Sequence, residues 1–446
     1  MDYNEALEYL LSHTDMERGF QASPSPTMNV ASVRSLLARL NDPHVGRGTV
    51  HVTGSKGKGS TSAMIANILR HAGHSTALFT SPHMHSFTER IVLDGDPVSP
   101  EEFAAAMELI RPAVEAEKES VHGNVSTFGI LTALFFWLVR AQARPVDWQV
   151  VEVGLGGTFD ATNVLDPPEI AVITPISLEH TAILGNTPAE IAKDKSGIIK
   201  AGTTAVLARQ QDPAVLDVVR DRSEEVGATV LDVASLYHVE ALEKHVFGQS
   251  ARLTGPSGDR ELRTPMLGHH QLENAATAVA AVEALRQRGV AVSDTAIADG
   301  IARTRLPGRL EVMGQGPLIV GDGAHNGESA AALARALTEY FEWRRCFLVI
   351  GTHGDKDVRA MGFQLAKLAE MIVCTRFRNP RAMDPYQMIQ EVGFLGPMAV
   401  AEESVPAALE TALSHAEPDD IVVITGSLYV VAEAREHLLG ESAIRR

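Results

Sequence analysis

The chain contains very little cysteine. Cys346 and Cys374 are the only two cysteines among 446 residues, which excludes a disulfide framework and a zinc site built from cysteines. Two thiols in a chain of this length are typical of a reducing compartment, so we expect a cytoplasmic protein. The first residues form neither a basic segment nor an apolar one, and no secretion signal is therefore predicted.

Long apolar runs and an excess of positive charge are also absent. The longest largely apolar stretch, residues 130–139, is too short to span a bilayer, which takes about 20 residues. The formal net charge of −17 argues against nucleic acid or an anionic membrane surface as a main partner. We therefore expect neither nucleic acid nor a membrane among the partners of this chain, and we expect a monomer.

A glycine-rich stretch is the most informative feature that is present. Residues 49–53 are a β-branched run typical of a buried strand, residues 54–59 form a turn rich in glycine, and a helix is predicted from Ser60 onward. This arrangement binds phosphates, because glycines let N–H groups approach and the helix N-terminus is partly positive. The P-loop pattern is incomplete, since Val52 replaces its first glycine and Lys58 is not followed directly by Ser or Thr. The alternative is a turn that binds nothing.

Two blocks of alternating strands and helices make up the chain. Residues 1–302 contain apolar strands of parallel-sheet type, such as 148–153 and 170–176, and residues 310–446 repeat the alternation after a linker at 303–309. We predict an α/β protein with an N-terminal, ATP-binding domain of P-loop type around a mostly parallel sheet. A smaller, Rossmann-like α/β domain follows. Ligands in such sheets bind at the carboxyl ends of the strands.

Two local patterns give further expectations. Residues 14–29 are polar and contain Pro24 and Pro26, which predicts a loop. Residues 187–190 read Thr-Pro-Ala-Glu, a capping box that predicts a helix continuing to about Lys200.

Several polar residues stand at the predicted strand ends. Glu152 lies in an apolar strand, where a carboxylate is costly unless it binds a metal or accepts hydrogen bonds from local backbone donors. His180 is either a metal ligand or a loop histidine whose hydrogen bonds are satisfied locally. Lys195 is either a functional residue of the site or a solvated surface lysine. Asp322 and His325 follow a strand of the second block, where an Asx-type turn and a ligand-binding loop are both compatible with the sequence.

Many short motifs occur in one order along the chain. They are Gly54-Ser-Lys-Gly-Lys-Gly-Ser60, Ser81-Pro-His, Glu89-Arg90, Glu152-Val-Gly-Leu-Gly-Gly157, Asp160-Ala-Thr-Asn163, Glu179-His180, Lys195-Ser-Gly-Ile198, His270-Gln271 with Asn274-Ala275, Pro307-Gly-Arg309, Asp322-Gly-Ala-His-Asn326, Asp355-Lys-Asp357 and Gly426-Ser-Leu-Tyr429. In this order, over about residues 30–435, the chain resembles the folylpolyglutamate synthase/dihydrofolate synthase family of the Mur ligase superfamily.

The resemblance implies an ATP-dependent amide ligase. Such an enzyme joins L-glutamate to the carboxylate of a reduced folate or of dihydropteroate. The carboxylate first attacks the γ-phosphate of ATP, and the glutamate amine then displaces phosphate from the acyl phosphate. Two Mg²⁺ ions are implied, and a monovalent cation is left open. Because two anions meet in the first step, cations at the triphosphate should provide most of the catalysis.

Two other functions stay open at this point. A peptidoglycan-precursor ligase of the same superfamily would share the ATP site, and a P-loop kinase or NTPase would share only the glycine loop.

The resemblance also implies a set of site residues. Catalysis is assigned to Lys58, His180 and Lys195, the last of them carbamylated and helping to hold the second metal ion. ATP is assigned to Gly57, Lys58, Gly59, Ser60, Asn274, Arg309, Asp322 and His325. The metal ligands are Ser60, Ser81, Glu152 and His180. The folate or its pterin is assigned to Phe128, Gly156, Gly157 and Asp160, and glutamate to Ser427 and Tyr429 of a C-terminal glutamate-ligase domain.

The chain departs from the family pattern in four places. Ser55-Lys56 replaces Thr-Asn in the glycine loop, and Glu179 replaces the aspartate that commonly precedes the metal histidine. Gly129 stands where a glutamate is common near the pterin, and residues 19–28 do not resemble the usual pterin loop. The departures concern the pterin part more than the ATP part, so dihydropteroate is expected to be the weaker donor.

Overall fold

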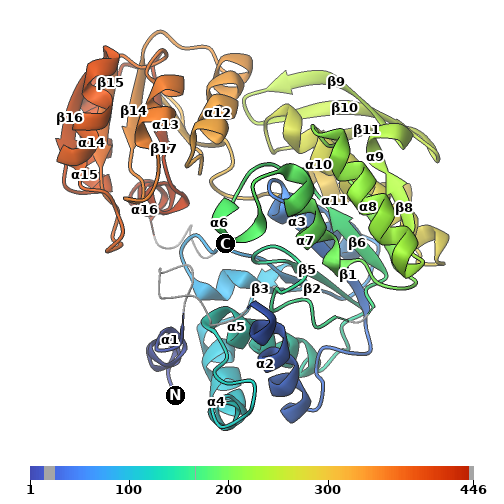
Figure 1. Cartoon of the computed structure of the whole chain (residues 1–446). Coiled ribbons are helices and arrows are strands. Elements are labelled where there is room, and N and C mark those ends of the chain that lie inside the picture. Colours follow the sequence, from blue (N-terminus) through green and yellow to red (C-terminus); the bar gives the residue numbers. More distant parts are fainter. Residues whose placement is uncertain (15–25, 166, 441–446) are drawn as a thin grey trace. The chain divides into compact units, whose positions relative to one another are not determined.

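The computed structural model describes residues 1–14, 26–165 and 167–440 and divides into two compact units (Figure 1). The first unit comprises Met1–Ala241, Ala251–Arg263 and His270–Thr304, and the second comprises Leu242–Ser250, Thr264–His269 and Arg305–Arg446. Both contain strands and helices, which confirms the α/β class. The loop predicted at 14–29 lies largely outside the described residues. At its end the prediction is wrong, because helix α2 (Pro26–Arg39) begins at Pro26, where proline suits the first turn.

A mostly parallel sheet forms the centre of the first unit, as predicted. Its strands lie in the order β4-β3-β2-β5-β1-β6-β7-β8, and only the pairs β2–β3 and β3–β4 are antiparallel. The strands are β1 (Gly48–Thr53), β2 (Thr76–Phe79), β3 (Ile91–Leu93), β4 (Asp96–Pro97), β5 (Trp148–Glu152), β6 (Ile170–Ile173), β7 (Thr204–Leu207) and β8 (Thr229–Asp232). The prediction of a strand at 170–176 is right in position but three residues too long.

Helices pack on both faces of this sheet. They are α1 (Tyr3–Leu11), α2, α3 (Lys58–His71), α4 (Pro100–Glu117), α5 (Thr127–Arg140), α6 (Thr181–Leu184), α7 (Pro188–Lys195), α8 (Pro213–Val226), α9 (Val233–Leu236), α10 (His269–Gln287) and α11 (Asp294–Ala302). Phe79 and Val151 pack in one core with α1, α2, α4 and α5. Because side chains alternate along a strand, Glu152 points to the other face, where α3 contacts β1, β2 and β5.

Helix α7 is shorter than its sequence pattern predicts. The capping box is present, with Thr187 Oγ accepting from the Glu190 N–H, but the helix ends at Lys195 and a 3₁₀ turn, Ser196–Ile198, follows. At this end of the helix the carbonyl of Asp194 accepts from the N–H and the hydroxyl of Thr158 at 3.0 and 2.7 Å, so a residue outside the helix satisfies one of its terminal carbonyls.

A six-stranded sheet forms the second unit, in the order β12-β13-β17-β14-β15-β16, with only β12–β13 antiparallel. The strands are β12 (Glu311–Gly314), β13 (Leu318–Gly321), β14 (Cys346–Ile350), β15 (Met371–Thr375), β16 (Met398–Glu402) and β17 (Ile421–Thr425). The helices are α12 (Gly327–Tyr340), α13 (Val358–Leu365), α14 (Pro385–Val392), α15 (Val405–His415) and α16 (Leu428–Leu439). A C-terminal α/β domain is thereby confirmed.

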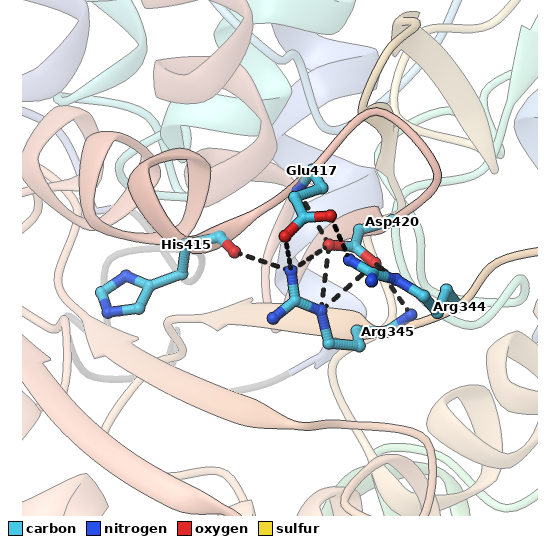
Figure 2. Close-up of polar contacts among 5 residues, drawn as sticks. All are labelled: Arg344, Arg345, His415, Glu417 and Asp420. Carbon is cyan, nitrogen blue, oxygen red and sulfur yellow. Dashed lines mark hydrogen bonds and ion pairs between the residues drawn. The ribbon is translucent and has the colours of Figure 1, made fainter.

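A polar cluster joins the amino ends of two central strands of this sheet (Figure 2). The buried Asp420 carboxylate, just before β17, accepts from the N–H of Arg345 at 3.1 Å and from its Nη2 at 2.7 Å. Arg344 Nε also donates to it at 3.4 Å, and the N–H of Glu417 donates at 2.8 Å. Arg345 Nη2 reaches the carbonyl of His415 at 3.1 Å. One carboxylate therefore ties the start of β14 to the start of β17.

The structure also contains a separate three-stranded sheet, which the sequence does not predict. It contains β9 (His238–His245), β10 (Gly248–Gly255) and β11 (Gly258–Thr264), in the order β11-β10-β9. Across the ranges that the structure describes, no helix combines the length and the apolar character needed to cross a membrane.

Candidate functional site

The glycine loop after β1 is held in place by close packing. Gly57 has a φ of 81° and caps α3, which begins at Lys58, two residues before the predicted start. A Cβ on Gly57 would lie 2.4 Å from Asn274 Oδ1, so α10 packs directly against the loop. A Cβ on Gly54, whose φ is 146°, would lie 1.9 Å from Thr174 Oγ1. The loop therefore requires glycine at both positions.

Two lysines converge on one carbonyl of this loop. Lys58 Nζ lies 3.0 Å from the Gly54 oxygen, and Lys195 Nζ lies 2.9 Å from it. Lys195 also forms an ion pair with Glu179, at 2.9 Å between Nζ and Oε1. Only 1% of Lys195 is exposed, so the alternative of a solvated surface lysine is wrong.

Burial and neighbouring charges shift both members of this ion pair. Burial lowers the pKa of Lys195, and the nearby Lys58 lowers it further, whereas Glu179 acts in the opposite direction. Burial alone would raise the pKa of Glu179, but Lys195 and Lys58 lower it on balance. Glu179 is therefore held ionised beside an ammonium group that loses its proton more readily than an ordinary lysine.

Glu152 lies against the first turn of α3. It ends β5 and is buried, and its Oε2 accepts from the N–H of Ser81 at 3.2 Å. A Cβ on Gly59 would lie 3.5 Å from the same oxygen, and the next residue, Ser60, is buried. The structure therefore brings together four of the predicted metal and ATP residues.

Oxygen donors of this kind suit Mg²⁺, which keeps waters and binds through one or two carboxylates together with substrate phosphates. Among residues 1–14, 26–165 and 167–440, no three His, Cys, Asp or Glu side chains gather to hold a metal ion. A magnesium site here would thus depend on hydroxyl, phosphate and water oxygens beside Glu152.

His180 is placed differently from these residues. It directly follows Glu179, is exposed, and has left-handed backbone with a φ of 46° at the start of α6. The metal role predicted for His180 stays a prediction.

The loop after β5, residues 154–163, packs against the end of α7. A Cβ on Gly156 would lie 2.2 Å from Asp194 Oδ2, and one on Gly157 would lie 2.6 Å from the carbonyl of Lys195. These two glycines therefore let the loop approach the buried lysine. Phe128 flanks the same loop, because its ring would lie 2.6 Å from a Cβ on Gly154.

Asp160 holds this loop together from within. Its Oδ1 accepts from the N–H of Thr162 at 2.9 Å and from the hydroxyl of Thr162 at 2.6 Å. Its Oδ2 accepts from the N–H of Leu155 at 2.9 Å. Burial raises the pKa of Asp160, while these hydrogen bonds act against that increase. The carboxylate thus organises the loop, whatever it contacts in a complex.

The second unit brings together three of the predicted ATP residues. Asp322 Oδ1 accepts from the N–H of Ala324 at 2.9 Å, the hydrogen bond of an Asx turn, and Oδ2 accepts from the N–H of Leu310 at 2.9 Å. A Cβ on Gly323 would lie 2.9 Å from Arg309 Nη1. His325 is exposed, and its Nδ1 lies 3.0 Å from the Gly323 oxygen. The Asx turn is therefore present. ATP binding by these residues stays a prediction.

Ser427 and Tyr429, predicted to bind glutamate, lie at the start of α16. Ser427 caps the helix, with Oγ accepting from the N–H of Tyr429 at 3.2 Å. The ring of Tyr429 stacks on Phe377 at 5.5 Å and meets His353 edge-on at 5.8 Å. Sequence reasoning missed Phe377 and His353, because no local pattern links loops after different strands.

Sequence reasoning also missed two polar residues of β1. His51 and Thr53 are completely buried, and both bond the loop after β5: His51 Nε2 lies 2.8 Å from Thr162 Oγ1, and Thr53 Oγ1 donates to the carbonyl of Gly156 at 2.7 Å. A signal was available, since polar side chains at alternate positions of a buried strand need partners on one face.

Comparison with protein families matches both units. Residues 52–282 match the Mur ligase middle domain, and residues 308–428 match the Mur ligase glutamate ligase domain. A dihydrofolate synthase/folylpolyglutamate synthase of Bacillus subtilis (strain 168) is 36% identical over 410 residues, which cover 91% of this chain and 94% of that protein. A folylpolyglutamate synthase of Lacticaseibacillus casei is 32% identical over 446 residues and 99% of each chain.

Solved structures show the same similarity. Mycobacterium tuberculosis folylpolyglutamate synthase complexed with ADP superposes with a TM-score of 0.87 at 32% identity, covering 97% of each chain. Escherichia coli FolC in complex with DHPP and ADP superposes with a TM-score of 0.85 at 27% identity, covering 100% of this chain and 99% of that chain.

Proposed function

Because this chain belongs to the folylpolyglutamate synthase/dihydrofolate synthase branch of the Mur ligase family, we propose that it forms its amide bond through an acyl phosphate. Its activity is the ATP-dependent ligation of glutamate to folates. The reported relatives match nearly the whole chain, and they favour neither a peptidoglycan-precursor ligase nor a P-loop kinase or NTPase.

The first step joins two anions. An oxygen of the folate carboxylate attacks the γ-phosphorus of ATP, a carbon–oxygen–phosphorus linkage forms, and the bond to the β-phosphate breaks to release ADP. Lys58 and the N–H groups at the start of α3 stabilise the charge on the phosphates. Gly57 and Gly59 let the backbone approach, and Asn274 packs against Gly57. The observation that supports this proposal most is the position of the Glu152 carboxylate against Gly59.

The second step uses the glutamate amine as nucleophile. Its nitrogen attacks the acyl carbon, the bond from that carbon to the phosphate oxygen breaks, and phosphate leaves while the amine gives up a proton. We assign glutamate to Ser427 and Tyr429 of the second unit, and nucleotide binding to Arg309, Asp322 and His325 there. The folate is assigned to Phe128, Gly156, Gly157 and the loop that Asp160 organises.

Magnesium fits the residues of the first unit. Ser60, Ser81, Glu152 and His180 would hold it, since the buried Glu152 carboxylate lies against Gly59 and the buried Ser60 is the next residue of α3. Bound there, Mg²⁺ would neutralise phosphate charge as a Lewis acid. The chain's own contribution is to orient Glu152, whose Oε2 accepts from the N–H of Ser81.

Lys195 is proposed to become carbamylated. The reaction requires its neutral amine, and burial lowers the pKa of Lys195 in that direction. The nitrogen attacks carbon dioxide, a proton is released, and the product is a carboxylate that can join the metal ligands. Carbon-13 NMR after exchange with labelled bicarbonate tests this: a carbamate signal is expected in the native protein and not in Lys195→Met.

The reaction itself is tested with the purified full chain, ATP, Mg²⁺, labelled glutamate and tetrahydrofolate. We expect labelled glutamate in the folate, with one ADP and one phosphate released for each amide bond. Release of AMP and pyrophosphate would instead show attack at the α-phosphorus and contradict the acyl phosphate.

A further inference from the structure

Strand β1 supports two loops of the first unit at once. His51 and Thr53 are two residues apart and therefore point to the same face of the sheet, opposite Val50 and Val52. Both side chains hydrogen-bond the loop at 154–163, through Thr162 and through the carbonyl of Gly156. The same strand runs directly into the glycine loop, which begins at Gly54. One strand thus sets the position of the loop at 154–163 relative to the glycine loop.

Two hydrogen bonds connect His51 to Asp160 through the Thr162 hydroxyl, and the donor and acceptor of each can be assigned. Asp160 already accepts from two backbone N–H groups, so the Thr162 hydroxyl donates to it, at 2.6 Å. With its hydrogen committed, the Thr162 oxygen can only accept, and the donor is the Nε2–H of His51, at 2.8 Å. Burial lowers the pKa of His51 to about 3, which keeps the imidazole neutral. Its Nδ1 has no hydrogen-bond partner among the described residues.

We propose that His51 is a positioning residue for the ligation. Through Thr162 and Asp160 it holds the loop at 154–163 where the donor folate must lie for its carboxylate to meet the γ-phosphate. The inference rests on the proposed function, because it takes this loop to be the folate loop. His51 touches neither substrate in this account and acts only through the loop.

A positioning role for His51 differs measurably from a purely structural one. A core residue that only fills space lowers stability, and kinetics change little in the protein that stays folded. A positioning residue changes the use of one substrate, because a displacement of about 1 Å away from the reacting atoms can cost about a hundredfold in rate.

The experiment compares two pairs of variants in the full-length chain. Thr162→Val and His51→Leu break the hydrogen-bonded connection from His51 through Thr162 to Asp160, which we call the relay. Thr162→Ser keeps the hydroxyl, and His51→Gln keeps a side-chain donor that can reach it. We expect the two breaking variants to lower kcat/KM for tetrahydrofolate by about ten- to a hundredfold, with an unchanged Kd for ADP. The conservative partners should recover most of that loss.

Thr203→Val is the matched control. Thr203 is a buried threonine in the same unit, and its hydroxyl makes one hydrogen bond, to the carbonyl of Pro168 at 2.9 Å. We expect it to lower Tm as much as Thr162→Val does and to leave kcat/KM unchanged. If His51→Leu does not fold, Thr162→Val still tests the relay, since it removes a single hydroxyl at nearly constant volume.

Two results would overturn the inference. One is a Thr162→Val enzyme with wild-type kcat/KM for tetrahydrofolate, and the other is an equal loss of affinity for ADP, which would show a general weakening of the unit. Failure of the proposed function would look different, because the wild-type enzyme itself would then fail to join glutamate to tetrahydrofolate.

Discussion

At the scale of single residues, the two lysines at the Gly54 carbonyl have separable roles. Lys195 is buried in an ion pair with Glu179, whereas Lys58 is half-buried and stands in the first turn of α3. Both donate to the same oxygen. Removing Lys58 therefore leaves that carbonyl with a donor, while removing Lys195 would leave Glu179 without its ion-pair partner.

Lys58→Ala should abolish most turnover without unfolding the protein. Loss of one preorganised donor at a developing charge typically costs about a hundred- to a thousandfold in kcat, whereas stability should change by less than about 0.5 kcal/mol because no buried group loses its last partner. Steady-state kinetics and thermal unfolding measure the two effects. Lys56→Ala, in the same loop, is the control and should behave as wild type. Near-normal activity of Lys58→Ala would show that the glycine loop does not bind the triphosphate.

The sequence predicts some of these residues for physical reasons and cannot predict others. A lysine inside a glycine-rich turn and a carboxylate in an apolar strand are visible because each is costly or unusual where it stands. The burial of Lys195 is not visible, because helical spacing alone does not say which face a short helix hides. His51 is recognisable as a polar residue in an apolar strand, but the sequence does not identify its partner Thr162, which is more than a hundred residues away in the chain.

At the scale of elements, the start of α3 depends on one glycine. Gly57 combines left-handed backbone with contact against Asn274. A comparable φ, 70°, occurs at Gly227 at the end of α8, where nothing lies within 4 Å of an added Cβ. An added Cβ would therefore meet backbone strain alone at Gly227, and both strain and crowding at Gly57.

Gly57→Ala should therefore lose nucleotide binding, and Gly227→Ala should not. Both substitutions place a Cβ in left-handed backbone, which costs about 1–2 kcal/mol of unfolding free energy. Only Gly57→Ala also displaces Asn274 and the N–H groups of the first helical turn. Isothermal titration with ADP and denaturant unfolding measure the two consequences. Equal affinity for ADP in the two variants would refute the assignment of this helix start to phosphate.

The Asp420 cluster in Figure 2 should make the stability of the second unit depend on acid. Burial alone would raise the pKa of Asp420, but Arg345, the N–H of Glu417 and Arg344 together lower it well below its usual value. A carboxylate with a lowered folded-state pKa adds stability above its unfolded pKa of about 3.9, and this contribution is lost as the pH falls below that value.

Asp420→Ala should remove this acid-sensitive part of the stability. The N–H groups of Arg345 and Glu417 would lose a buried acceptor, which costs about 1–3 kcal/mol at neutral pH. Below about pH 4 the difference from wild type should shrink, because the Asp420 carboxylate takes up a proton there in the unfolded wild-type chain, while its lowered pKa keeps it ionised in the folded protein. Urea unfolding between pH 7 and 3 measures both effects. Glu417→Gln, at an exposed partner, is the control and should change stability by less than about 1 kcal/mol. A difference that is independent of pH would contradict this account.

Among the elements, the apolar runs predict the central strands β1, β5 and β6, and the capping box at 187–190 predicts the start of α7. The predictions fail where a distant contact decides the boundary. Thr158 donates to the carbonyl of Asp194 in the last turn of α7, and the antiparallel strands β3, β4 and β12 have only three, two and four residues, too few to show a periodic pattern.

At the scale of the whole molecule, both sheets carry their candidate residues at the carboxyl ends of parallel strands, as general rules for α/β folds predict. The motif order predicts the family, and the comparisons confirm it over nearly the whole chain. Which donor is preferred cannot be read from such agreement, because relatives at similar identity carry different names: one is a dihydrofolate synthase/folylpolyglutamate synthase, another a folylpolyglutamate synthase.

The residue at position 129 bears on the choice of donor. Gly129, where the family often has a glutamate, lies in the first turn of α5, and a Cβ there would lie 2.7 Å from Val125 Cγ1 and 2.8 Å from Val33 Cγ2. No longer side chain fits that position, so it cannot supply a carboxylate to a pterin. The other departure, at residues 19–28, falls mostly outside the described residues and stays a sequence-based prediction.

A pterin acid without glutamate makes fewer contacts and depends more on such a carboxylate. Loss of one charged hydrogen bond costs about 1.5–3 kcal/mol, or roughly ten- to a hundredfold in kcat/KM. We therefore expect dihydropteroate to be used less well than tetrahydrofolate by about that factor. Side-by-side measurement of kcat/KM at saturating ATP and glutamate, with one enzyme preparation for both donors, decides the matter. Equal values for the two donors would mean that another part of the chain, outside Gly129, supplies the missing contact.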